Sequence, residues 1–213
     1  MKVEYLDSMG DDLSVANAAR VSFGKWKKEF DQRDARLIAY LAEHRHDSPF
    51  FHPHVQLRIT APIFVARQWW RHQIGVARNE VSRRYVSDEP AFYRVTRWRK
   101  RPADSIKQGS GGDMDPHQQF SIKRKVDDVQ HQCKMLYENL IERGVAPEQA
   151  RSILPQSMMT TWIETGSLAY YARACRLRKA ADAQGEIQEL ARMVESEVQP
   201  LFPVAWGELC STE

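Results

Sequence analysis

Apolar and polar residues alternate most clearly over residues 55–60, where Val55, Leu57 and Ile59 are separated by polar side chains. This period of two is typical of a strand with one buried face. Residues 2–7 (KVEYLD) and 158–165 (MMTTWIET) are further strand candidates. The chain is therefore expected to contain at least a small sheet.

Elsewhere apolar residues recur every three or four positions, as on one face of a helix. Pro62 opens one such helix, where its missing N–H costs nothing, and Asp11 or Asp12 caps another. The longest stripe is formed by Ile122, Val126, Val129, Cys133, Leu136 and Leu140. Helices are expected at 13–21, 34–43, 62–73, 122–140, 147–154, 168–177 and 187–198, with a loop at 87–117. This mixture indicates a single α+β domain spanning residues 1–213.

The composition indicates a globular protein rather than a disordered or membrane-spanning one. The chain has 213 residues, 42% of them hydrophobic and 28% charged, which is ordinary for a globular domain and excludes whole-chain disorder. No apolar run approaches a membrane span, and the acidic start does not resemble a signal peptide, so a cytoplasmic protein is expected. The three cysteines are far apart and form no CxxC motif, which favours reduced thiols.

The densest basic segment runs from Arg67 to Arg84, with five arginines and one acid, Glu80, in 18 residues. A continuous helix would place Gln68, Arg71 and His72 on one face. Buried arginines need an anionic partner, and with one acid nearby, a ligand phosphate is favoured. The alternative is a solvated basic surface.

Arg178 continues the apolar stripe of the helix at 168–177, three residues after Cys175. An arginine on an inward face favours a buried anion, whereas an arginine at a helix end can also extend to solvent. Arg151 lies in the short helix before Pro155 and indicates nothing by itself.

Other kinds of site are less well supported. The pairs His44/His46 and His52/His54 resemble a metal cluster, but no cysteine joins them. No glycine-rich phosphate loop is present, and Cys133 and Cys175 lie on apolar stripes, where thiols are usually inert. The run at 94–101 (RVTRWRKR) interleaves basic residues with a tryptophan, as in nucleic-acid binding, although an exposed loop is commoner.

Six segments together resemble a known family, the flavin-dependent thymidylate synthases, in family order over nearly the whole chain. They are AARVSF (18–23), SPFFH (48–52), APIFVARQWWRHQ (61–73), NEVSRRY (79–85), ARSILP (150–155) and LR…AQGEIQ (177–188). The resemblance implies the fold of that family, a mainly antiparallel sheet packed with helices, in a homotetramer whose active sites lie between subunits. It implies FAD as cofactor, dUMP as substrate, and NADPH and methylenetetrahydrofolate as co-substrates, with neither membrane nor nucleic acid as partner.

The resemblance also assigns residues. It places dUMP against Gln68, Ser82, Arg83, Arg84, Arg151 and Arg178. It places FAD against Ser22, His52, Arg71, His72, Gln73, Glu80 and Ser167. Arg178, Ser82 and His52 are the catalytic candidates: Arg178 faces the uracil carbonyls, Ser82 lies near the pyrimidine without attacking it, and His52 lies beside the flavin ring. Arg84 and Arg151 would hold the phosphate by charge-assisted hydrogen bonds.

The sequence departs from the family pattern on the flavin side. Gln73 replaces an arginine, and the loop around Gly75 is one residue longer, so that Arg78 is a candidate to restore the charge. Ser167 and Ala169 stand where the family has an asparagine and an arginine that contact the flavin. Asp182 stands where relatives have a histidine near the flavin.

These departures leave alternatives open. The product would be hydroxymethyl-dUMP if water replaced hydride in the last step, a reaction suited to a virus acting in a host cytoplasm. A second alternative within the family is dCMP as the substrate. Outside this family, the alternatives are a non-enzymatic nucleic-acid-binding protein and a metalloenzyme.

Overall fold

The computed structural model describes residues 1–86, 88–102 and 109–211. Its centre is a four-stranded antiparallel sheet in the order β1 (Lys2–Met9), β2 (His54–Pro62), β4 (Met159–Ser167) and β3 (Val76–Glu80). β2 and β4 pair along their whole length, and both alternate buried and less buried residues. The three strands expected from the sequence are confirmed, whereas the edge strand β3 was not predicted.

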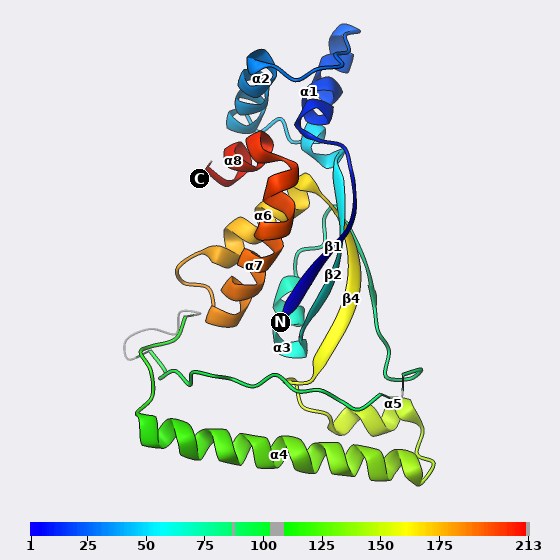
Figure 1. Ribbon diagram of the computed structural model, residues 1–213, viewed down its shortest axis with the longest axis vertical. Helices are drawn as coiled ribbons and strands as arrows, with labels where there is room; N and C mark the ends of the chain where they lie inside the picture. Colours follow the sequence, from blue (N-terminus) through cyan, green and yellow to red (C-terminus); the bar gives the residue numbers. More distant parts are fainter. Residues whose placement is uncertain (87, 103–108, 212–213) are drawn as a thin grey trace.

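The two helices α6 (Leu168–Lys179) and α7 (Gly185–Val198) pack against each other beside the sheet (Figure 1). The shorter helix α3 (Ile63–Trp69) directly follows β2 and contacts α7, β2 and β4. Large side chains fill the space between these elements, and the burial of their apolar surface stabilises the fold. The largest of the fully buried ones include Trp69, Trp162, Tyr170, Tyr171, Leu57, Ile59, Leu168 and Ile187.

A helical lobe covers one end of the sheet. It consists of α1 (Asp12–Arg20), the 3₁₀ turns η1 (Val21–Phe23) and η2 (Ser48–Phe51), α2 (Gln32–Glu43), the turn η4 (Gln199–Leu201) and α8 (Pro203–Ser211). Asp11 caps α1 in a reciprocal capping box with Ser14, which confirms one of the two expected caps. The helix α8 was not predicted.

The end of α2 contains an unusual residue. The N–H of His46 donates to Leu41 O and that of Arg45 to Ala42 O, the two bonds of a Schellman motif. Arg45 takes the left-handed position with a φ of 55°, where glycine is the usual residue. Among the described residues it is the single non-glycine residue with positive φ. Its conformation costs about 1–2 kcal/mol.

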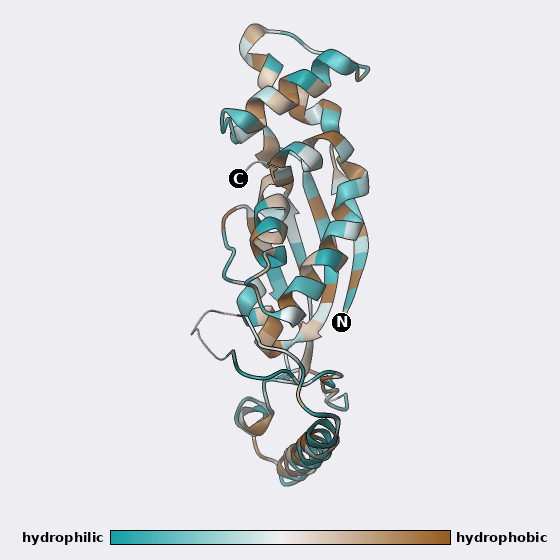
Figure 2. Cartoon of the chain, turned by 90° about the vertical axis from the view of Figure 1, so that its left-hand side faces the viewer, coloured by the Kyte–Doolittle hydropathy of each residue, from teal (hydrophilic) through white to brown (hydrophobic). Residues whose placement is uncertain are grey.

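A separate arm lies across the other end of the molecule (Figure 1). It consists of the 27-residue helix α4 (Pro116–Glu142), the short helix α5 (Pro147–Ala150) and the turn η3 (Arg151–Ile153). Figure 2 shows α4 nearly end-on, apart from the sheet. The long helix was expected, but its apolar stripe is not buried as a whole. Val129 is 54% and Leu136 48% exposed, so these side chains are available to another surface.

The segment 87–117, expected to be a loop, contains two isolated β-bridges, Phe92 with Met158 and Arg99 with Asp113. The helix α4 begins at Pro116, just before the predicted end of this loop. Part of the prediction, at 87 and 103–108, lies outside the described residues. None of the described helices combines the length and apolar character needed to cross a bilayer.

Candidate functional site

The site is built around a cross-strand ion pair. Arg78 on β3 lies directly opposite Glu164 on β4, and its Nε donates to Glu164 Oε2 at 2.9 Å. Glu164 has no exposed side-chain surface and also accepts hydrogen bonds from the indole N–H groups of Trp69 and Trp162 and from the Tyr170 hydroxyl. The buried carboxylate is therefore fully engaged by donors, as a buried charge requires.

Arg78 also fixes the turn that follows α3. Its Nη2 donates to the carbonyl oxygen of His72 at 2.8 Å and to the Tyr170 hydroxyl at 2.6 Å. Burial would lower the pKa of Arg78, but the neighbouring Tyr170 and Glu164 outweigh it and raise the pKa. The guanidinium therefore stays charged and joins the buried carboxylate to the backbone of the turn.

His72 connects this network to Arg178. The Nε of Arg178 donates to His72 Nε2 at 3.0 Å, and its Nη2 donates to the carbonyl oxygen of Gln68 at 3.0 Å. Burial, followed by the charges of Arg178, Arg173 and Arg78, lowers the pKa of His72 to about 4. His72 is therefore neutral near pH 7, and its Nε2 lone pair accepts the hydrogen bond from Arg178.

The resulting cluster is rich in cations. Burial and the charge of Arg71 lower the pKa of Arg178, and Arg173 donates to Ile74 O at 3.0 Å. The carboxylate of Glu164 is already paired with Arg78. In the described part of the chain, Arg178 forms no ion pair with an acid, and its Nη1 donates to no group. The cluster is suited to an anion or to carbonyl oxygens of a ligand.

A second group of site residues lies after β3. Ser82 Oγ accepts from the backbone N–H and the Nε of Arg84 at 3.3 and 3.4 Å, and the Arg84 guanidinium lies 5.1 Å from the centre of the Tyr85 ring. Arg83 and Arg84 line a cavity of about 290 Å³ against α4 and Pro147, and Arg151 begins the adjacent turn η3. Within the described residues, no hydrogen bond or ion pair links Arg84 or Arg151 to Arg178.

The remaining candidates are spread over the chain. Ser22 in η1, His52 and Gln73 are exposed, and Glu80 accepts a hydrogen bond from Thr160 Oγ1 at 2.6 Å. Ser167 is buried, and its hydroxyl accepts the N–H of Tyr170 as the cap of α6. In this chain Ser167 therefore has a structural contact, and its expected flavin contact stays a prediction.

Two sequence expectations need correction. The helix that begins after Pro62 ends at Trp69, so Arg71 and His72 lie in the following turn rather than on one helical face with Gln68. Arg78 does not supply a free charge in place of Gln73, because Glu164 neutralises it. That carboxylate was missed because it is 86 residues away in sequence. The available signal was that Glu164 shares the inward face of its strand with Thr160 and Trp162.

Three of the four histidines considered as metal ligands instead contact an aromatic ring or the backbone. His44 stacks on Tyr40 with ring centres 4.0 Å apart, His46 packs edge-on against the same ring, and His54 Nδ1 bonds to the carbonyl oxygen of His52 at 2.9 Å. Within residues 1–86, 88–102 and 109–211, no group of three or more His, Cys, Asp or Glu side chains is arranged to hold a metal ion. Burial raises the pKa of the Cys175 thiol well above its usual value, which disfavours a reactive thiolate.

Comparison with known proteins gives consistent results. The sequence model described as "Thymidylate synthase complementing protein" matches residues 4–204. The chain is 39% identical to a flavin-dependent thymidylate synthase of Thermus thermophilus, covering 96% of this chain and 74% of the relative. It is 38% identical to that of Thermosipho africanus, covering 89% of this chain and 82% of the relative.

A similar solved structure is the UMP/dUMP methylase PolB from Streptomyces cacaoi bound with 5-Br dUMP. Its TM-score is 0.83 at 32% identity, over 97% of this chain and 93% of that chain.

Proposed function

This chain belongs to the flavin-dependent thymidylate synthase family, and from that membership we propose that it transfers a one-carbon unit from methylenetetrahydrofolate to carbon five of dUMP and reduces it, giving dTMP. The enzyme is accordingly a flavoprotein methyltransferase. The observation that carries the proposal is the half-buried Arg178, which is held by Gln68 and His72 and has no acidic partner among the described residues.

Arg178 is proposed to bind the uracil ring. Two of its donors are occupied by protein groups and orient the guanidinium, which leaves Nη1 for a carbonyl oxygen of the base. A fixed positive charge at this point stabilises the negative charge that develops on the ring as carbon five forms its new bond. The neutral His72 supports this role, because it accepts a hydrogen bond without adding a repelling charge.

The nucleotide phosphate is proposed to bind Arg84 and Arg151, with Ser82 and Arg83 beside the nucleotide. Since no described contact joins these arginines to Arg178, we propose that a complete site takes residues from more than one copy of the chain, in a homotetramer. The partly exposed stripe of α4 and the exposed side chains Phe23 (77%) and Trp26 (74%) support burial against other subunits.

The flavin is proposed to be FAD, with NADPH as the reductant. A dinucleotide carries a pyrophosphate, and the cations Arg71 and Arg173 around His72 fit such a group. Ser22, His52, Gln73 and Glu80 complete the proposed contacts. When bound, the flavin supplies the reducing equivalents of the reaction, and the protein residues bind and orient it.

The test is the variant Arg178→Ala, with Arg192→Ala on α7 as the control for loss of one arginine. Arg178→Ala is expected to lose dUMP-dependent turnover while its circular dichroism and flavin content remain those of the wild type. Arg192 donates to Gln188 within its own helix, so its variant should keep turnover. Undiminished turnover in Arg178→Ala would refute the role given to this residue.

A further inference from the structure

The side-chain amide of Gln68, near the end of α3, is held in one orientation by the protein. Its Nε2 donates to the backbone oxygen of Phe64 at 3.3 Å and to the side-chain oxygen Oε1 of Gln184 at 2.8 Å. A backbone carbonyl can only accept, so the amide cannot turn over without losing a bond. Both amide hydrogens are therefore occupied, whereas no described residue donates to Gln68 Oε1.

The connection between α6 and α7 holds Gln68 at two points. Arg178, near the end of α6, donates from Nη2 to the backbone oxygen of Gln68 at 3.0 Å, and Gln184, just before α7, accepts from its side chain. Gln188 Nε2 braces this connection by donating to two of its carbonyl oxygens, at 3.2 and 2.9 Å. The side chain of Gln68 is thus fixed relative to Arg178.

Two groups remain free at this point, a donor and an acceptor. They are Nη1 of Arg178 and Oε1 of Gln68, and neither atom is sealed inside the protein, so a ligand can reach both. A donor beside an acceptor matches the edge of uracil, where a carbonyl oxygen adjoins N3–H. Cytosine has a lone pair at N3 instead, which an amide oxygen repels.

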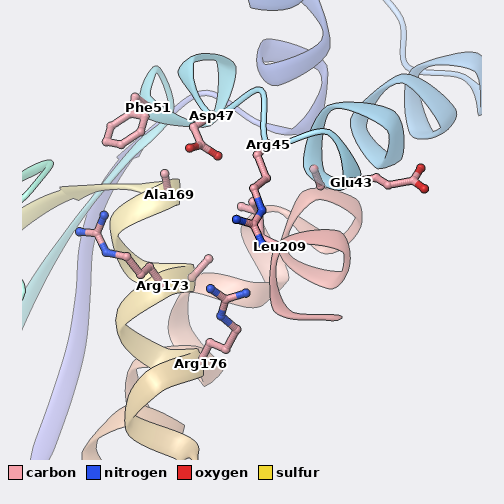
Figure 3. Close-up of a pocket in the computed structure, with 10 residues that line it drawn as sticks. Glu43, Arg45, Asp47, Phe51, Ala169, Arg173, Arg176 and Leu209 are labelled. Carbon is pink, nitrogen blue, oxygen red and sulfur yellow. The ribbon is translucent and has the colours of Figure 1, made fainter. Parts of the chain in front are cut away.

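The same helix relates the base to the flavin side of the site. In Figure 3, Arg173 extends from α6 beside a cavity of about 470 Å³, and it is proposed above to contact the flavin pyrophosphate. Because Arg173 and Arg178 lie on one helix, the orientation of the base also determines where its carbon five lies relative to the flavin. Cytosine could pair with the same donor and acceptor only if its ring were shifted or turned over, which would displace carbon five.

We propose that Gln184 is a positioning residue that makes the site selective for uracil over cytosine, an inference that rests on the proposed function. By accepting from Nε2 of Gln68, it keeps the amide oxygen of Gln68 toward N3–H of the base. Without this bond, the longer contact to Phe64 O alone holds the amide, which can then turn its NH2 group toward the ligand.

The experiment measures the binding of dUMP and of dCMP to the FAD-loaded protein by titration calorimetry, and compares the ratio of the two dissociation constants. Gln184→Met removes the acceptor with little change of size, whereas Gln184→Glu keeps acceptor oxygens. The side chain of Gln184 forms no cap bond with α7, so both variants are expected to fold. The control Gln199→Met removes an exposed glutamine whose side chain forms no hydrogen bond with the described residues.

The wild type is expected to prefer dUMP, and Gln184→Met is expected to reduce this preference at least about fivefold. Gln184→Glu and Gln199→Met should keep it. A merely structural role would weaken both nucleotides alike and leave the ratio unchanged.

An unchanged ratio in Gln184→Met, or an equal loss of preference in Gln184→Met and Gln184→Glu, overturns the inference and leaves the proposed function standing. A wild type that binds both nucleotides equally does the same. A wild type that binds neither nucleotide overturns the proposed function and the inference with it.

Discussion

The ion pair between Arg78 and Glu164 allows a quantitative prediction. The variant Arg78→Met keeps the length of the side chain but leaves the fully buried carboxylate of Glu164 without its cation. Removing one partner of a buried pair typically costs about 3–5 kcal/mol. Because Trp69, Trp162 and Tyr170 still donate to Glu164, we expect the lower end, about 3 kcal/mol.

The double variant Arg78→Met/Glu164→Gln removes the uncompensated charge and keeps an acceptor for the indole groups. It is expected to recover at least about 1.5 kcal/mol relative to the sum of the single variants, as groups in one network do. The assay is urea unfolding followed by tryptophan fluorescence at one protein concentration, since assembly affects stability. The control Arg97→Met removes an exposed pair with Asp113 and should produce no resolvable loss.

The reasoning would be refuted if Arg78→Met cost less than about 1 kcal/mol, or if the losses of the two single variants were additive. Either result would mean that Glu164 does not depend on the guanidinium, and that the turn containing His72 is held by other contacts.

Three further results are expected. The imidazole of His72 takes up a proton near pH 6.5 in the unfolded state but only near pH 4 in the folded state. The free energy of unfolding should therefore fall as the pH drops from about 6.5 to about 4, and it should fall less in His72→Gln. Parallel curves of unfolding free energy against pH for the two proteins would contradict this. Gly75 and Gly144 both have a φ of +80°, but a Cβ at Gly75 would lie 2.7 Å from Ser167 Oγ. Gly75→Ala should therefore destabilise the protein more than Gly144→Ala. Equal melting temperatures of the two variants would exclude the clash. His52→Ala should slow flavin reduction in stopped-flow measurements more than it weakens dUMP binding, and the reverse order would remove His52 from the flavin side.

The central elements follow from local pattern. The alternation of Val55, Leu57 and Ile59 predicts β2, because a strand with one buried face must place apolar side chains on that face. The strand β3 lacks this signal, since its five residues VARNE are mostly polar. Its pairing depends on β4, a distant segment, and on the ion pair that crosses between the two strands.

In the site, too, contacts between segments distant in sequence could not be predicted from local pattern. The resemblance to the family identified Gln68, His72 and Arg178, and the fold brings these residues together. Charge counting within one segment favoured a ligand phosphate for Arg78, whereas the sheet supplies Glu164 as its partner. The strained Arg45 was also missed, because the left-handed position is defined by how α2 ends and not by residue type.

The most direct test of the account is the mass of the nucleotide formed when the purified protein is incubated with FAD, NADPH, methylenetetrahydrofolate and dUMP. The account predicts a product heavier than dUMP by one CH₂ group, formed only when all four compounds are present. A product with one further oxygen would contradict the reductive last step, and unchanged dUMP would contradict the proposed substrate.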